Sequence, residues 1–189
     1  MLKILQENVY GLKEAIISSG YPMTSGNEPK YSEDRAIRLA QTPLGSGHSN
    51  FLKGIVVQFD VKYANYWTPQ FQRYSHIDIV SSNSKMYRLT KMDIKECCNE
   101  FVDDVVIENL NKWIDKYNNY DVNSDMTKHE VFMKIISNCP MGLEQILSVS
   151  TNYLQLKTIY NQRRHHKLDD WQVFCDWIET LPMAKELII

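Results

Sequence analysis

Apolar residues near the start of the chain recur at steps of three and four. Between Leu2 and Ser18 they are Ile4, Leu5, Val9, Leu12, Ile16 and Ile17. This spacing places them on one face of a helix, and Gly20 and Pro22 then end the pattern. We therefore expect an opening helix over 2–18. A second, short helix is expected after Ser32, which has the side chain of a good N-cap.

Alternation of apolar positions with mostly polar ones follows in the middle of the chain. In the segment 55–63 the apolar set Ile55, Val57, Phe59 and Val61 alternates with Val56, Gln58, Asp60 and Lys62. A period of two is typical of a half-buried strand. A second short strand is expected over 76–80, before the polar run 81–84.

The rest of the chain, after Asp93, has helical spacing. Thr127 and Glu130 form a capping-box pair, a helix is expected from Pro140 to about Gln162, and a last one follows with Asp169 as its cap. One buried helical face is expected from Phe101, Val105, Leu110, Trp113, Ile114 and Tyr117. Strands grouped together rather than alternating with helices indicate an α+β fold, with a small antiparallel or mixed sheet and a helical C-terminal half.

Composition limits the class of protein. With 189 residues, 43% of them hydrophobic, the chain suits a single domain over 1–189. Its net charge of -2 gives no global field toward nucleic acid or a membrane, and no uncharged apolar run is long enough for a signal peptide or a membrane span. We expect a cytoplasmic protein. The four cysteines lack C-x-x-C spacing, so we expect reduced thiols and no metal site.

Two polar segments could carry chemistry. The first runs from Gln70 to His76 and continues over 81–88, and it supplies Arg73, Lys85 and Arg88 together with hydroxyls and an imidazole. Such donors suit phosphates and base edges. A solvated hairpin is the alternative interpretation.

The second segment, 160–167, places five potentially cationic residues at the end of a helix. The helix macrodipole favours cations there without any ligand, so both interpretations stay open. The two adjacent histidines have no third ligand at metal-binding spacing. Neither a glycine-rich phosphate loop nor a G-x-S-x-G elbow is present.

Together the two segments resemble the flavin-dependent thymidylate synthases, whose signature is R-H-R-x-x-S-x-N-E-x-S-x-R-Y. His48 precedes the long strand and Arg73 follows it at the family's spacing, with Gln70 just before. The segment Ser84-Lys85-Met86-Tyr87 is similar to the closing S-x-R-Y, and Asn161-Gln162-Arg163 is similar to the family's N-L-R motif.

The resemblance implies a homotetramer that holds FAD between subunits and transfers a one-carbon unit from a folate to dUMP. It assigns catalytic roles to Ser84 and Arg163, and it places Arg73 on a phosphate. The full expected sets are His48, Gln70, Arg73 and His76 for the cofactor, and Arg73, Ser82, Ser84, Lys85, Arg88, Arg163 and Arg164 for the nucleotide.

The sequence departs from the signature at three positions. Tyr74 and Ser75 replace the second and third residues of R-H-R, and Met86 replaces the arginine of S-x-R-Y. Loss of one charge-assisted bond, worth roughly 1.5–3 kcal/mol, weakens nucleotide binding by one to two orders of magnitude unless Lys85 or Arg88 compensates.

Three functions are therefore compatible with the sequence. The first is a divergent flavin-dependent methylase or hydroxymethylase of a pyrimidine nucleotide. The second is a non-catalytic, phage-like protein that sequesters a nucleotide signal as a sponge. The third is a structural oligomer whose interface uses Tyr63, Tyr66, Trp67 and Phe71, although aromatic residues beside a strand more often belong to the core. The first two require the segments around Arg73 and Arg163 to converge on one anion-binding crevice.

Overall fold

The fold is α+β, as expected from the grouping of the strands. The computed structural model describes all 189 residues. All strand pairings are antiparallel, and the sheet order is β1-β2-β4-β3. The strands are β1 (Lys3–Tyr10), β2 (Val56–Ala64), β3 (Asp78–Ser82) and β4 (Glu144–Asn152).

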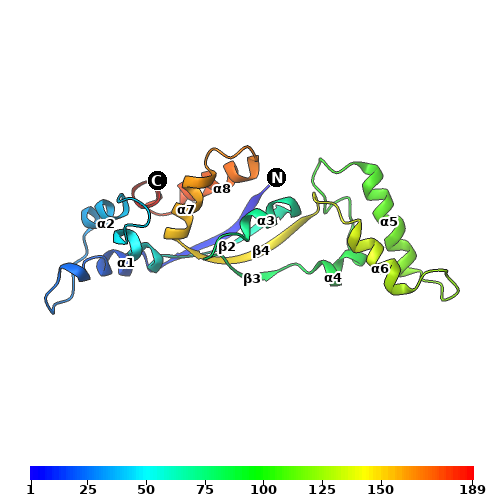
Figure 1. Cartoon of the computed structure of the whole chain (residues 1–189), viewed down its shortest axis with the longest axis horizontal. Coiled ribbons are helices and arrows are strands. Elements are labelled where there is room, and N and C mark those ends of the chain that lie inside the picture. Colours follow the sequence, from blue (N-terminus) through cyan, green and yellow to red (C-terminus); the bar gives the residue numbers. More distant parts are fainter.

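Figure 1 shows an elongated molecule in which α7 and α8 lie over one side of the sheet, α1 and α2 lie near one end, and α5 with α6 form a lobe at the other. The helices are α1 (Leu12–Ser18), α2 (Glu33–Ala40), α3 (Thr68–Phe71), α4 (Lys85–Arg88), α5 (Asp104–Asn118), α6 (Lys128–Ser137), α7 (Tyr153–Arg163), α8 (Asp169–Thr180) and α9 (Ala184–Leu187). Short 3-10 turns cover Tyr21–Met23, His48–Gly54, Asn65–Trp67 and Leu89–Lys91.

The alternation expected along β2 is confirmed. Val57, Phe59 and Val61 are buried, whereas Gln58 between them is exposed. The buried face packs on an aromatic layer in which Phe174 of α8 contacts Phe59, with ring centroids 5.8 Å apart. The sheet therefore has one face in the core and one face toward solvent.

The aromatic residues next to β2 belong mainly to this core. Tyr63, Trp67 and Phe71 are buried, and the rings of Trp67 and Phe71 stack with centroids 4.2 Å apart. Only Tyr66 reaches a partly exposed position, where its hydroxyl donates to Asp170 over 2.8 Å. The expectation that aromatic residues beside this strand belong to the core is thus confirmed for three of the four, and these three are not available for a subunit contact.

The opening helix over 2–18 was a wrong prediction, because its first part is strand β1. Only Ile4 and Val9 of this edge strand are partly buried, and β1 pairs along β2 instead of coiling. Gly11 makes the change to α1 possible. Its φ is 76°, and a Cβ there would collide with the carbonyl oxygen of Gly54.

The helix predicted over 140–162 was also wrong in its first half. Leu147, Val149 and Thr151 are buried at every second position of β4, and they pair with Val61, Phe59 and Val57 of β2. Helix α7 starts only at Tyr153, after Asn152 caps its first turn by accepting from the backbone N–H of Gln155. The second half of the chain is therefore not entirely helical.

The lobe of α5 and α6 has a small core of its own. Its buried residues are Leu89, Ile94, Ile107, Leu110, Ile114, Ile135 and Leu143. The capping box of Thr127 and Glu130 at the start of α6 is confirmed, as is the Ser32 cap of α2. The buried face predicted from residue 101 onward was wrong at its beginning, because Phe101 and Val105 are 80% and 68% exposed.

No helix of the protein combines the length and hydrophobicity required to cross a lipid bilayer. All four cysteines are free, and only Cys175 in α8 is fully buried.

Candidate functional site

A polar crevice lies between α7 and the loop that follows α3. Its volume is about 340 Å³, and we call it the α7 crevice. Gln155, Thr158 and Gln162 stand at positions i, i+3 and i+7 of α7, which places them on one face of the helix. The lining residues are Arg73, Tyr74, Ser75, Gln155, Thr158, Gln162 and Arg163.

Arg163 is fixed in this crevice by three neighbours. Its Nε donates to the Tyr74 hydroxyl over 2.7 Å, and its guanidinium lies 4.8 Å from the centre of the Trp171 ring. Gln70 Oε1 accepts from Trp171 Nε1 at 2.9 Å and from Arg163 Nη1 at 3.5 Å. Stacking on an aromatic face and hydrogen bonds from the N–H groups both limit the rotation of a guanidinium. Arg163 is therefore held in place before any ligand binds.

The charge of the α7 crevice is uncompensated. Neither Arg73 nor Arg163 forms a salt bridge, and no carboxylate lines the crevice. The next residue, Arg164, differs: its guanidinium pairs with Asp176 at 2.5 Å and with Glu179 at 3.3 Å, and these acids raise its pKa. Two adjacent arginines at the end of α7 thus have different environments. Of the two, only Arg163 is available to an anion.

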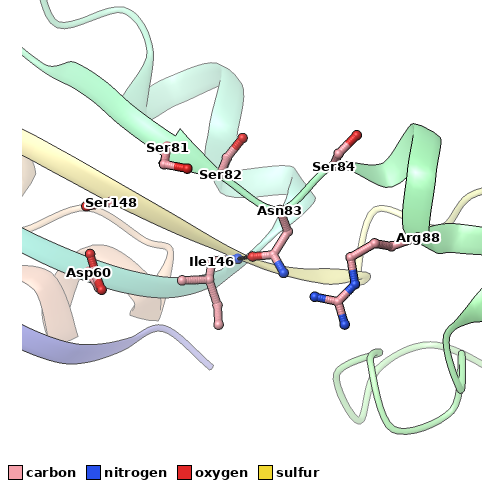
Figure 2. Close-up of a pocket in the computed structure, with 8 residues that line it drawn as sticks. All are labelled: Asp60, Ser81, Ser82, Asn83, Ser84, Arg88, Ile146 and Ser148. Carbon is pink, nitrogen blue, oxygen red and sulfur yellow. Dashed lines mark hydrogen bonds between the residues drawn. The ribbon is translucent and has the colours of Figure 1, made fainter.

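A second cavity, about 470 Å³ in volume, lies at the solvent-facing side of the sheet, and we call it the open-face pocket. In Figure 2 the guanidinium of Arg88 extends from α4 toward Asn83, whereas the hydroxyls of Ser82 and Ser84 point to the opposite side of that segment. Asn83 accepts from the backbone N–H of Ile146 over 3.0 Å. The lining residues are Asp60, Ser81, Ser82, Asn83, Ser84, Arg88, Ile146 and Ser148.

The structure divides the site residues expected from the sequence. Arg73 and Arg163 line one crevice, as the anion-binding hypothesis requires, with Gln70 directly behind Arg163. Ser82, Ser84 and Arg88 line the open-face pocket instead. Their roles in binding or catalysis stay predictions.

Three further expected residues lie outside both cavities. His48, in the 3-10 turn that packs against α7, is exposed, and His76 is exposed with its backbone carbonyl accepting from Thr151 Oγ1 at 2.7 Å. Lys85 donates from Nζ to Asn65 Oδ1 over 3.2 Å. Within one protomer these side chains do not join the two arginines.

Gln155 and Thr158 were not among the residues expected from the sequence, and Gln162 was expected only as the middle residue of the motif that ends at Arg163. Their spacing on one helical face was visible in the sequence, but α7 was predicted as part of a longer helix, so its polar side had no assigned position.

The α7 crevice can bind an anion and orient a polar ring, since it contains guanidinium groups, hydroxyls and amides. It has no histidine or carboxylate that could transfer a proton. The imidazole of His166 packs edge-on against Trp171, and its pKa is lowered by burial and by Arg163 and Lys167. No group of three or more His, Cys, Asp or Glu side chains is close enough to hold a metal ion.

The sequence matches no protein-family model, and no curated protein is similar enough in sequence to be matched. Solved structures do match. One is ThyX, the flavin-dependent thymidylate synthase of Helicobacter pylori, in complex with FAD and dUMP. It superposes with a TM-score of 0.67 at 14% identity, over 100% of this chain and 96% of the other. The fold is that of ThyX.

Two more structures agree on the ThyX fold. A second H. pylori ThyX complex with FAD and dUMP gives a TM-score of 0.65 at 13% identity over 98% of this chain and 97% of that one. The UMP/dUMP methylase PolB from Streptomyces cacaoi, bound with 5-Br dUMP, gives a TM-score of 0.63 at 12% identity, over 99% of this chain and 93% of that one. At these identities the likeness concerns the fold alone.

Proposed function

We propose that the protein binds a nucleotide in the α7 crevice, with the anionic group held by Arg73 and Arg163. The observation that carries this proposal is the pairing of two arginines in a crevice without any carboxylate. Charge-assisted bonds from a fixed guanidinium to phosphate are among the stronger polar contacts, at roughly 1.5–3 kcal/mol each. The alternatives for Arg163, a surface ion pair or a free cation on a helix end, do not fit its hydrogen bond to Tyr74 and its position over the Trp171 ring.

The ligands we propose are a uracil nucleotide and FAD, because the matching ThyX structures contain dUMP and FAD and the methylase contains a dUMP analogue. Both ligands carry phosphate, which suits the two arginines, and the crevice volume lies near the lower end of the roughly 300–1,000 Å³ usual for ligand sites. FAD, when bound, would supply the redox chemistry that no side chain here provides.

One-carbon transfer to dUMP is the proposed reaction. Ser84 and Arg88 lie on the other side of the sheet from α7, so one protomer cannot place them around a ligand in the α7 crevice. We therefore propose a cytoplasmic homotetramer in which His48, His76, Ser82, Ser84, Lys85 and Arg88 of one protomer approach the α7 crevice of another.

A second candidate is nucleotide sequestration without reaction. Met86, 56% exposed, stands where the family signature has an arginine, and Arg164 is engaged by two acids. Both features reduce the number of cations available for catalysis while leaving Arg73 and Arg163 free to bind.

Titration of the purified chain with dUMP and with FAD, by calorimetry and by the flavin absorbance, tests the proposal. We expect the Arg73→Ala/Arg163→Ala double variant to lose measurable binding, and Arg38→Ala, which removes an exposed arginine of α2, to retain it. Unchanged binding in the double variant would contradict the α7 crevice as the site. Binding without conversion of dUMP in the presence of folate and reductant would favour sequestration.

A further inference from the structure

Gln155 has an unusual environment for a side chain with two hydrogen-bonding groups. The residue is only 7% exposed and lines the α7 crevice, yet its amide makes no hydrogen bond with the protein. The polar side-chain atoms that are sealed from solvent without a partner are Trp67 Nε1, Thr68 Oγ1 and Asn99 Nδ2, and the Gln155 amide is not among them. Its amide therefore opens into the crevice.

This amide has no partner in the protein, so its donor and its acceptor are both available to a ligand in the crevice. The backbone that carries it is held in place. The backbone N–H of Gln155 donates to Asn152 Oδ1 over 3.0 Å in the first turn of α7, so the side chain starts from a rigid point. Such a group has the properties of a preformed recognition element rather than of a surface glutamine.

The crevice has a charged end and a neutral end. Arg163 follows Gln155 by eight residues, which corresponds to about 12 Å along the helix axis. Thr158 and Gln162 lie between them on the same wall. A ligand with a phosphate at one end and a polar ring at the other would satisfy both ends together.

We propose that Gln155 is a specificity-determining residue that recognises a cyclic imide edge, that is, a ring N–H next to a ring carbonyl. Its Nε2 donates to the carbonyl and its Oε1 accepts from the ring N–H. This inference rests on the proposed function, in which Arg73 and Arg163 hold the phosphate. Uracil and the flavin ring both present this edge, so the ligand carrying it is either the nucleotide or the flavin.

The test compares ligands with and without that edge. Dissociation constants are measured for dUMP, 3-methyl-dUMP, deoxyribose 5-phosphate and FMN with the wild-type chain, Gln155→Leu and Gln155→Met. We expect Gln155→Leu to weaken dUMP or FMN binding about tenfold and to leave deoxyribose 5-phosphate unchanged. The methylated nucleotide should bind the wild type as weakly as dUMP binds the variant, with no further loss in the variant.

The arms distinguish the possible outcomes. A loss confined to dUMP assigns the imide to the nucleotide, and a loss confined to FMN assigns it to the flavin. Equal affinities of dUMP and 3-methyl-dUMP for the wild type, with FMN unaffected in both variants, would overturn the role of Gln155 while leaving phosphate binding intact. Absence of binding by all four ligands to the wild type would instead overturn the proposed function itself. For the nucleotide, the methylated ligand leaves the protein unchanged, so that arm does not depend on the variants folding. For the flavin, unchanged binding of deoxyribose 5-phosphate shows that the variants are folded.

Discussion

The α7 crevice and the open-face pocket differ in what supports them and in how their charge is balanced. The open-face pocket is the larger, about 470 Å³ against about 340 Å³, but Asp60 shares its lining with Arg88. The α7 crevice has two arginines and no acid, and Trp171 behind it belongs to the buried aromatic layer. The proposal of the α7 crevice as the anion site therefore rests on charge balance and rigid support rather than on volume.

The largest expected difference between the two cavities is in the stability of the structure that supports them. Phe174 is fully buried and contacts the rings of Phe59, Trp67 and Trp171. Phe174→Ala should lower the free energy of unfolding by about 3–5 kcal/mol, since it removes an aromatic side chain and leaves a cavity. The matched change on the open face, Ile146→Ala, should cost less than about 1 kcal/mol. Urea unfolding measures both, and similar losses would refute the difference in support.

The two adjacent arginines at the C-terminal end of α7 give the next largest expected difference. Arg163→Ala should weaken nucleotide binding about 10- to 100-fold, because one charge-assisted contact is lost. Arg164→Ala should change the affinity less than about twofold, since Arg164 is already paired with Asp176 and Glu179. Calorimetry on the two variants decides the matter, and equal losses would indicate a diffuse cationic surface instead of a defined crevice.

Alkaline pH tests the buried layer without a ligand. Burial raises the pKa of Cys175 from 9.0 to about 11. Because the folded state holds this proton more tightly than the unfolded state, the stabilisation is complete below pH 9 and is lost as the pH rises through 11. The wild type should lose about 2 kcal/mol more than Cys175→Ala across that window. Urea midpoints at several pH values provide the measurement. Equal losses of stability in the wild type and in Cys175→Ala would contradict the expectation.

The smallest effect is expected at Asp60, which accepts from Gln6 Nε2 over 2.6 Å. Asp60→Asn removes the negative charge of the open-face pocket, so phosphate binding at Arg88 should strengthen by no more than about threefold. NMR titration of the arginine side chains with inorganic phosphate follows Arg88 and Arg163 together. If phosphate shifted the Arg88 signal of the wild type as strongly as the Arg163 signal, the two cavities would not differ in anion binding.

The sequence predicted the fold class because β2 has a clear period of two and its neighbours do not alternate with helices. It failed at β1, where only Ile4 and Val9 are partly buried, so the same residues also satisfy helical spacing. It failed at β4 because Leu147, Val149 and Thr151 lead directly into the helical spacing of Tyr153, Leu156 and Ile159. In both places the pairing with β2, a long-range contact, determined the structure.

The candidate site was partly predictable for a similar reason. Arg73 and Arg163 were identified by charge and spacing, and the structure places them on one crevice. The sequence could not separate Arg163 from Arg164, since the acids that engage Arg164 come from α8. It could not single out Gln155 either, because burial and the lack of a partner are properties of the folded chain.

The most direct measurement is a crystal structure of the protein grown with 5-bromo-dUMP, with anomalous scattering used to locate the bromine. We predict a bromine peak within the α7 crevice and the phosphate between Arg73 and Arg163. A peak in the open-face pocket, with the α7 crevice unoccupied, would contradict the assignment of the site.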